Sequence, residues 1–140
     1  MLKNYLCTIF GIVAGYFVML IGGMDKMFLA LIVAMAIDYL TGICVALFFK
    51  NSPKTENGAL KSNEGIKGLF KKIAIIMAVI LANELDVVME TSYVRSAVIT
   101  GFLVNETVSV TENIGLMGVP LPQKLIDAIE ILKKKDGTKK

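Results

Sequence analysis

Polar side chains that could carry chemistry lie within the most apolar stretches of this 140-residue chain. They are spaced along three segments and comprise Asp38, Thr41, Glu84, Asn105, Glu106 and Ser109. A carboxylate in such a setting must be protonated, paired with a cation or hydrated. The only nearby cation inside the span of the apolar segments is Arg95, at an end. We therefore expect water to be the partner of the acids, and an assembly of several copies would supply a water-lined interior.

These residues do not form a catalytic pattern. The chain has no His, which removes the usual general base near neutral pH, and its two Cys are too few for a zinc cage. The acids are not accompanied by a nucleophilic Ser on a strained turn, a Gly-rich phosphate loop or metal-ligand spacing. We therefore expect a protein that is not an enzyme and needs no cofactor or metal.

The composition predicts an all-α integral membrane protein. Apolar residues make up 55% of the chain and charged residues 19%, with a mean hydropathy of +0.67, against roughly 45–50% and 25% in soluble domains. Residues 5–24 carry no charge, and residues 27–49 carry only Asp38. Each run, as a helix, is at least about 30 Å long, which is the thickness of the hydrocarbon core. The short link between them predicts an antiparallel hairpin within residues 1–49.

A second, more polar membrane hairpin is expected within residues 73–113. Its apolar segments, 73–89 and 96–110, are interrupted by acids. One central acid costs about 2.5–3.5 kcal/mol on insertion, against about 0.3–0.6 gained per large apolar residue, so these segments need protein partners. We expect about four transmembrane helices, with three spans and one interfacial or re-entrant segment as the alternative.

Lysines predict the orientation. Residues 50–72 hold six Lys and two Glu and are expected to form a basic loop, while residues 124–140 hold six Lys and three acids. Basic segments next to membrane helices stay cytoplasmic, so we expect a multi-pass protein of the cytoplasmic membrane with both termini inside. Because the lysines lie in loops and tails, we expect no nucleic-acid partner. Residues 114–140 combine a Pro/Gly turn, an amphipathic helix from Pro122 to Leu132 on the cytoplasmic surface, and a basic tail.

Small residues recur at four-residue spacing in every apolar segment, which lets helices approach closely in lipid. We expect copies of the chain to associate through these positions and the polar residues beside them. The predicted oligomer or pore interface comprises Gly11, Gly15, Ala34, Asp38, Thr41, Gly42, Gly101, Asn105, Glu106, Ser109, Glu112 and Asn113. Two alternatives stay open: the small residues pack a compact bundle within one chain, and the polar face of residues 105–113 caps a helix end among lipid headgroups.

Four blocks of sequence resemble the phage-lysis and toxin-secretion holins of Gram-positive bacteria and their phages. They are Asp38-Tyr39-Leu40-Thr41-Gly42, the basic segment 65–72, Asn105-Glu106-x-x-Ser109-x-x-Glu112-Asn113, and Gly118-Val119-Pro120-Leu121-Pro122. The resemblance covers nearly the whole chain. It implies a non-enzymatic protein that oligomerises into a large pore in the cytoplasmic membrane and releases an endolysin or a toxin.

Two other functions remain open from the sequence. An antiholin, which restrains such a pore, would look almost the same. A small proton-coupled multidrug transporter is the other alternative, although such a transporter would be expected to carry an acid in its first helix, where residues 5–24 have none.

Overall fold

The computed structural model describes residues 1–49 and 62–137, and over this part of the chain it contains helices and no strands. In chain order the helices are α1 (Leu2–Ile21), α2 (Lys26–Cys44), the π-helical turn η1 (Val45–Phe49), α3 (Ser62–Met89), α4 (Val94–Leu116) and α5 (Gln123–Gly137). The predicted all-α class is confirmed. The amphipathic helix expected near the C-terminus is present as α5, which begins directly after Pro122.

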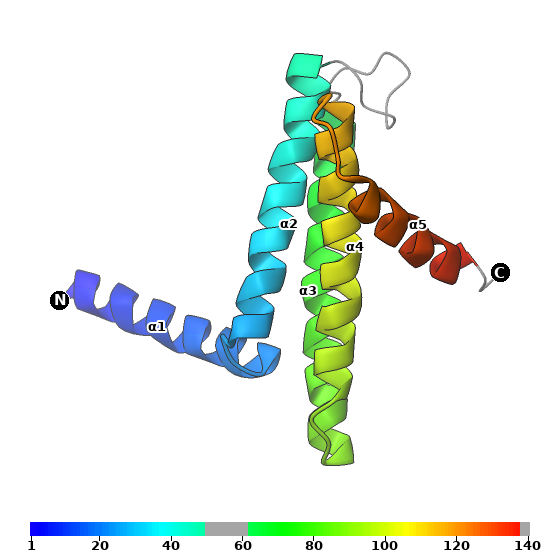
Figure 1. The fold of residues 1–140 in the computed structure, drawn as a ribbon. Helices are drawn as coiled ribbons and strands as arrows, with labels where there is room; N and C mark the ends of the chain where they lie inside the picture. Colours follow the sequence, from blue (N-terminus) through cyan, green and yellow to red (C-terminus); the bar gives the residue numbers. More distant parts are fainter. Residues whose placement is uncertain (50–61, 138–140) are drawn as a thin grey trace.

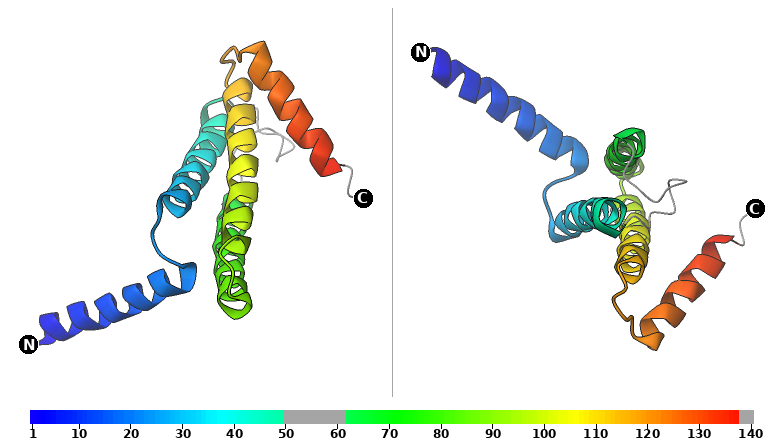
Figure 2. Two further views of the ribbon diagram at one scale, coloured as in Figure 1. Left: turned by 60° about the horizontal axis from the view of Figure 1, so that its bottom comes forward. Right: turned by 90° about the horizontal axis from the view of Figure 1, so that it is seen from above.

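Helices α2, α3 and α4 pack side by side as a three-helix bundle, and α1 and α5 project away from it (Figures 1 and 2). We call the end where η1 finishes, α3 begins and α4 finishes the loop end. The opposite end, with the α1–α2 and α3–α4 connections, is the turn end. The 24 residues of α2 with η1, the 28 of α3 and the 23 of α4 give lengths of about 35–42 Å, which exceeds a hydrocarbon core of about 30 Å.

Two helices of the described residues are long and apolar enough to cross a membrane. They are Leu2–Ile21, with a mean hydropathy of 1.9, and Lys26–Phe49, with 2.2. They coincide with the two strongest apolar runs of the sequence. Helices α3 and α4 are more polar, as expected for the second pair, and the predicted total of four spans is not confirmed.

The path of α1 differs from the expected hairpin, because α1 leaves the bundle sideways instead of returning along α2 (Figure 1). Gly22 and Gly23 have φ angles of 84° and 98°, and they turn the chain at the end of α1. Gly22 N–H donates to Met19 O and Gly23 N–H to Val18 O, which is the usual closure of a helix by a left-handed glycine. Asp25 then starts α2 by accepting a hydrogen bond from Phe28 N–H at 2.8 Å.

The C-terminal part of the segment that was expected to form a basic loop is helical. Residues 62–72 form the first turns of α3, while residues 50–61 lie outside the described part of the chain. The glycines there face the Tyr39 ring on α2: a Cβ on Gly68 would lie 3.6 Å from it, in ordinary contact. Packing against α2 therefore accompanies helix formation in a segment whose composition suggested a loop.

The apolar core fills the half of the bundle toward the turn end. Its buried members are Ile21, Phe28, Leu31, Met35, Val79 and Ile99. Ile21, the last residue of α1, is the buried residue of that helix. Toward the loop end the interior combines the buried Val45 and Ala46 of η1 with buried polar side chains.

Candidate functional site

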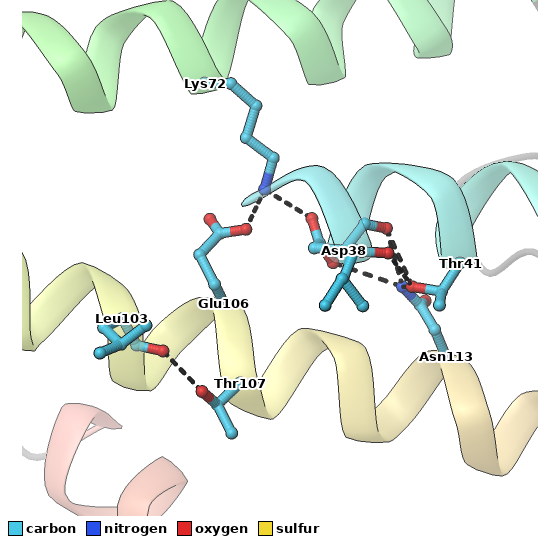
Figure 3. Close-up of polar contacts among 8 residues, drawn as sticks. Asp38, Thr41, Lys72, Leu103, Glu106, Thr107 and Asn113 are labelled. Carbon is cyan, nitrogen blue, oxygen red and sulfur yellow. Dashed lines mark hydrogen bonds and ion pairs between the residues drawn. The ribbon is translucent and has the colours of Figure 1, made fainter. Parts of the chain in front are cut away.

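A charged triad joins the three helices of the bundle (Figure 3). Lys72 Nζ, from α3, donates to Asp38 Oδ2 of α2 at 2.6 Å and also to Glu106 Oε2 of α4. The side chains of Lys72, Asp38 and Glu106 are 13%, 11% and 8% exposed. Asp38 and Glu106 each lie close to the middle of their helices, so the triad is set deep in the bundle.

Asn113 of α4 extends this triad toward the loop end. Its Nδ2 donates to Thr41 Oγ1 at 3.0 Å and lies 3.3 Å from Asp38 Oδ1 and 3.4 Å from Asp38 O. The Thr41 hydroxyl donates in turn to Ile37 O, one turn back in α2, at 2.8 Å. We call Asp38, Thr41, Lys72, Glu106 and Asn113 the polar network, and it brings together the sequence blocks at 38–42, 65–72 and 105–113.

The expectation that water is the partner of the acids is wrong for Asp38 and Glu106, because Lys72 pairs with both. From its sequence context, Lys72 was expected in a loop outside the apolar segments. Because α3 begins at Ser62, Lys72 is a helical residue, and its long side chain reaches between α2 and α4. Charges buried at this depth are tolerated when they are paired in this way.

Of the other residues of the predicted interface, Gly42 borders the polar network, because a Cβ on it would lie 3.7 Å from Asn113 Nδ2. The remaining residues lie outside this network. A Cβ on Gly11, Gly15 or Gly101 would meet nothing within 4 Å, and these glycines are exposed. Asn105 and Glu112 are also exposed, whereas Ser109, Ala34 and Gly42 are half-buried. Thus the structure brings four of the predicted residues together with Lys72 inside the bundle and leaves the others exposed or half-buried.

A second polar cluster, at the turn end, was not predicted. Arg95, 8% exposed, donates from Nη1 to Asp25 Oδ2 at 2.6 Å, from Nε to Ile21 O at 2.5 Å and from Nη2 to Gly23 O at 3.1 Å. The hydrogen bond from Arg95, helped by Phe28 N–H, lowers the pKa of Asp25 below its ordinary value of 3.8. The isolated Arg95 in an apolar stretch was the available signal, but its partners are backbone carbonyls that no sequence pattern marks.

Asp86 fixes the turn from which Arg95 extends. Its Oδ2 accepts from Arg95 N–H at 2.8 Å, and its Oδ1 accepts from Val94 N–H at 3.0 Å and from the Thr91 hydroxyl at 2.5 Å. Asp86 therefore caps the first turn of α4 across the α3–α4 connection. This acid has a structural partner, which the sequence analysis did not assign.

The chemistry of both clusters is electrostatic. Among the described residues no group of His, Cys, Asp or Glu is arranged to hold a metal ion. The polar network ties three helices together with charged and neutral hydrogen bonds, and the Arg95 cluster ties the connections at the turn end. Both arrangements position helices relative to one another.

Comparison with known proteins gives a consistent family. Residues 15–134 match the model of the bacteriophage holin family. An uncharacterized protein of Listeria innocua is 35% identical over 129 residues, which cover 91% of this chain and 84% of that protein. An uncharacterized 14.9 kDa protein of Clostridium perfringens is 32% identical over 121 residues, covering 85% and 86%.

One relative has a stated function in its name. A protein called a probable holin, from Bacillus phage phi105, is 29% identical over 104 residues, covering 74% of this chain and 71% of its own. No solved structure matches the chain. Because the family model spans most of the sequence and includes the three blocks that build the polar network, this chain belongs to the bacteriophage holin family.

Proposed function

We propose that this protein is a holin: copies of it assemble in the cytoplasmic membrane into a pore that releases an endolysin or a toxin from the cell. The observation that carries the proposal is the family match over residues 15–134, together with the phage relative named a probable holin. Its role is mechanical, and it requires no enzymatic activity.

The distribution of polar and apolar side chains supports a membrane location. The polar network lies inside the bundle, whereas large apolar side chains are exposed along α1, α2 and α3. A soluble protein of this size would not leave so much apolar surface to water, whereas a lipid-facing surface is expected to be apolar. The bilayer is therefore the proposed solvent of this exterior.

The outward face of α4 is the proposed contact between copies. Ala97, Gly101 and Asn105 are exposed and follow one another at four-residue spacing. The Asn105 side chain makes no hydrogen bond to the described part of the chain, although it lies at the middle of α4. An amide both donates and accepts hydrogen bonds, so the Asn105 side chain of one copy pairs with that of a second copy. Gly101 permits the close approach of the two helices that this pairing requires.

This surface is tested by Asn105→Leu and Gly101→Leu, with Ala36→Leu on the exposed side of α2 as the bulk-matched control. We expect cross-linking in membranes to show fewer high-order species for both α4 variants and the wild-type pattern for the control. Helix content is measured alongside, to establish that the variants fold. A wild-type cross-linking pattern in both α4 variants would remove this face from the proposed interface.

The proposed topology places the loop end in the cytoplasm, because residues 50–72 and 124–140 carry the lysine excess. A cytoplasmic N-terminus follows when α1 also crosses the bilayer. In a variant without Cys7 and Cys44, cysteines introduced at Ser62 or at Thr138, beyond the described residues, should resist a membrane-impermeant reagent applied to intact cells. Strong labelling at either position would contradict this orientation.

Pore formation is tested by induced expression in a bacterium, with a membrane-potential dye and the release of a cytoplasmic reporter protein followed together. A holin collapses the potential and releases the reporter. A proton-coupled exporter keeps the membrane tight and retains the reporter. An antiholin also retains it when expressed alone but delays release when a known holin is expressed with it, so the three functions give different results.

A further inference from the structure

The end of α1 is held by side chains of two other helices. After the closure by Gly22 and Gly23, two carbonyls of the last turn of α1 still need donors. Asn83 Nδ2, on α3, donates to Leu20 O at 3.1 Å, and Arg95 Nε, on α4, donates to Ile21 O at 2.5 Å. A cation at the C-terminal end of a helix also complements the helix dipole.

One guanidinium group connects three parts of the turn end. Besides Ile21 O, Arg95 binds Gly23 O and the carboxylate of Asp25, and Asp25 in turn caps α2. Because Asp86 holds the backbone of Arg95, the guanidinium extends from a fixed support. The end of α1, the start of α2 and the α3–α4 connection thus meet at one buried side chain.

Gly22 allows this approach. A Cβ at this position would overlap Asn83 Oδ1 and would lie 2.9 Å from Arg95 Nε, so a side chain there displaces both groups. Gly23 has a similar positive φ, but a Cβ on it would meet nothing within 4 Å. The two glycines therefore share a backbone requirement and differ in the space around them.

Little else in the bundle holds α1. Ile21 is its buried residue, and the rest of the helix is exposed or half-buried, with its contacts to the bundle directed to α3. The direction of α1, which projects sideways from the turn end in Figure 2, is thus fixed at its last turn. A change there swings the whole apolar helix.

We propose that Asn83 and Arg95 form a latch on the last turn of α1, and that this latch sets the angle at which α1 leaves the bundle. With the latch closed, α1 keeps one direction. With the latch open, the Gly22–Gly23 connection is free to turn, and α1 takes a range of directions in the bilayer. The latch is thus a conformational device, and it does not depend on whether the assembled protein forms a pore.

Distance measurements on the full chain in liposomes test the latch. One spin label is placed on Cys7 of α1, which is exposed, and the other on a cysteine introduced by Met77→Cys on the exposed side of α3, in a Cys44→Ser background. We expect a narrow distance distribution in this parent protein. Asn83→Ala should broaden the distance distribution. Glu84→Gln, at the exposed position next to Asn83, should leave the distribution narrow.

Two further comparisons keep the test independent of a folding defect. Arg95→Lys retains the cation but not the planar fork that reaches three acceptors, and it should broaden the distribution as well. Gly22→Ala should broaden it more than Gly23→Ala, since only the first meets the latch. Helix content and a label pair within α3 and α4 report on the bundle. The latch is overturned if distributions stay narrow in Asn83→Ala and Arg95→Lys, if the two glycine variants behave alike, or if the bundle label pair broadens equally.

Discussion

Replacing Lys72 by Met should destabilise the bundle far more than replacing an exposed lysine of α3. Met has a similar length and fits the same path between α2 and α4, so the change removes the charge with little loss of volume. It leaves Asp38 and Glu106, which are only 11% and 8% exposed, without their shared cation. Breaking a buried ion pair costs about 3–5 kcal/mol, because an uncompensated charge stays buried.

The measurement is the free energy of unfolding in mixed micelles, followed by helix content as a denaturing detergent is added. Lys71→Met is the matched control: Lys71 is the neighbouring, exposed lysine, and its loss should change the free energy by about 0.5 kcal/mol or less. Adding Asp38→Asn and Glu106→Gln to Lys72→Met removes the uncompensated charges and should recover part of the loss. A loss from Lys72→Met no larger than that of the control, or no recovery in the triple variant, would refute the role assigned to the triad.

Two further predictions concern the other hydrogen bonds. Asn113→Leu removes the amide that joins Asp38 and Thr41, so it should lower the free energy of unfolding by about 1–3 kcal/mol in the same assay, while Asn105→Leu, at an exposed position, should not. The Arg95 contact lowers the pKa of Asp25, so its stabilisation is present above the ordinary value of 3.8 and is lost as the pH falls through the lowered pKa of the folded state. The free energy difference between wild type and Asp25→Asn should therefore be larger at pH 7 than at pH 3, and an equal difference at both would contradict this.

Helix positions followed from the sequence, but the partners of the buried charges did not. Long uncharged runs have few structural solutions in lipid, which is why α1 and α2 were predicted from residues 5–24 and 27–49. The basic segment before residue 73 was ambiguous, because lysines are typical of both loops and exposed helix ends. The assignment of Lys72 to a loop or to a helix depended on that boundary. The identity of the cation that pairs with Asp38 and Glu106 therefore depended on it as well.

The direction of α1 was beyond the sequence for a different reason. A short connection between two apolar runs normally predicts a hairpin. Here the geometry depends on two positive φ angles and on backbone carbonyls bound by Arg95, a residue more than 70 positions away. Only the tertiary structure brings that side chain to the end of α1.

Residues 105–113 illustrate how one sequence block serves two surfaces. Successive residues of an α-helix are separated by about 100°, so the polar residues of this block span an arc of about 120° on α4. Glu106 and Asn113, seven residues apart, form the buried edge of that arc, whereas Asn105 and Glu112, also seven apart, form the exposed edge, with half-buried Ser109 between them. The sequence pattern predicts one polar face, but the packing of α4 against α2 and α3 divides this arc into a buried and an exposed edge.

This division leads to a last prediction, in which stability and assembly separate. Glu106→Gln weakens the pairing with Lys72, so it should lower the free energy of unfolding. The molecules that remain folded should still cross-link as the wild type does. Asn105→Leu should keep the free energy of unfolding and reduce cross-linking, because the exposed edge meets another copy in the proposed assembly. The two assays applied to both variants give a crossed pattern under this reasoning. If Glu106→Gln changed assembly alone, or if Asn105→Leu destabilised the monomer, the assignment of the two edges would be wrong.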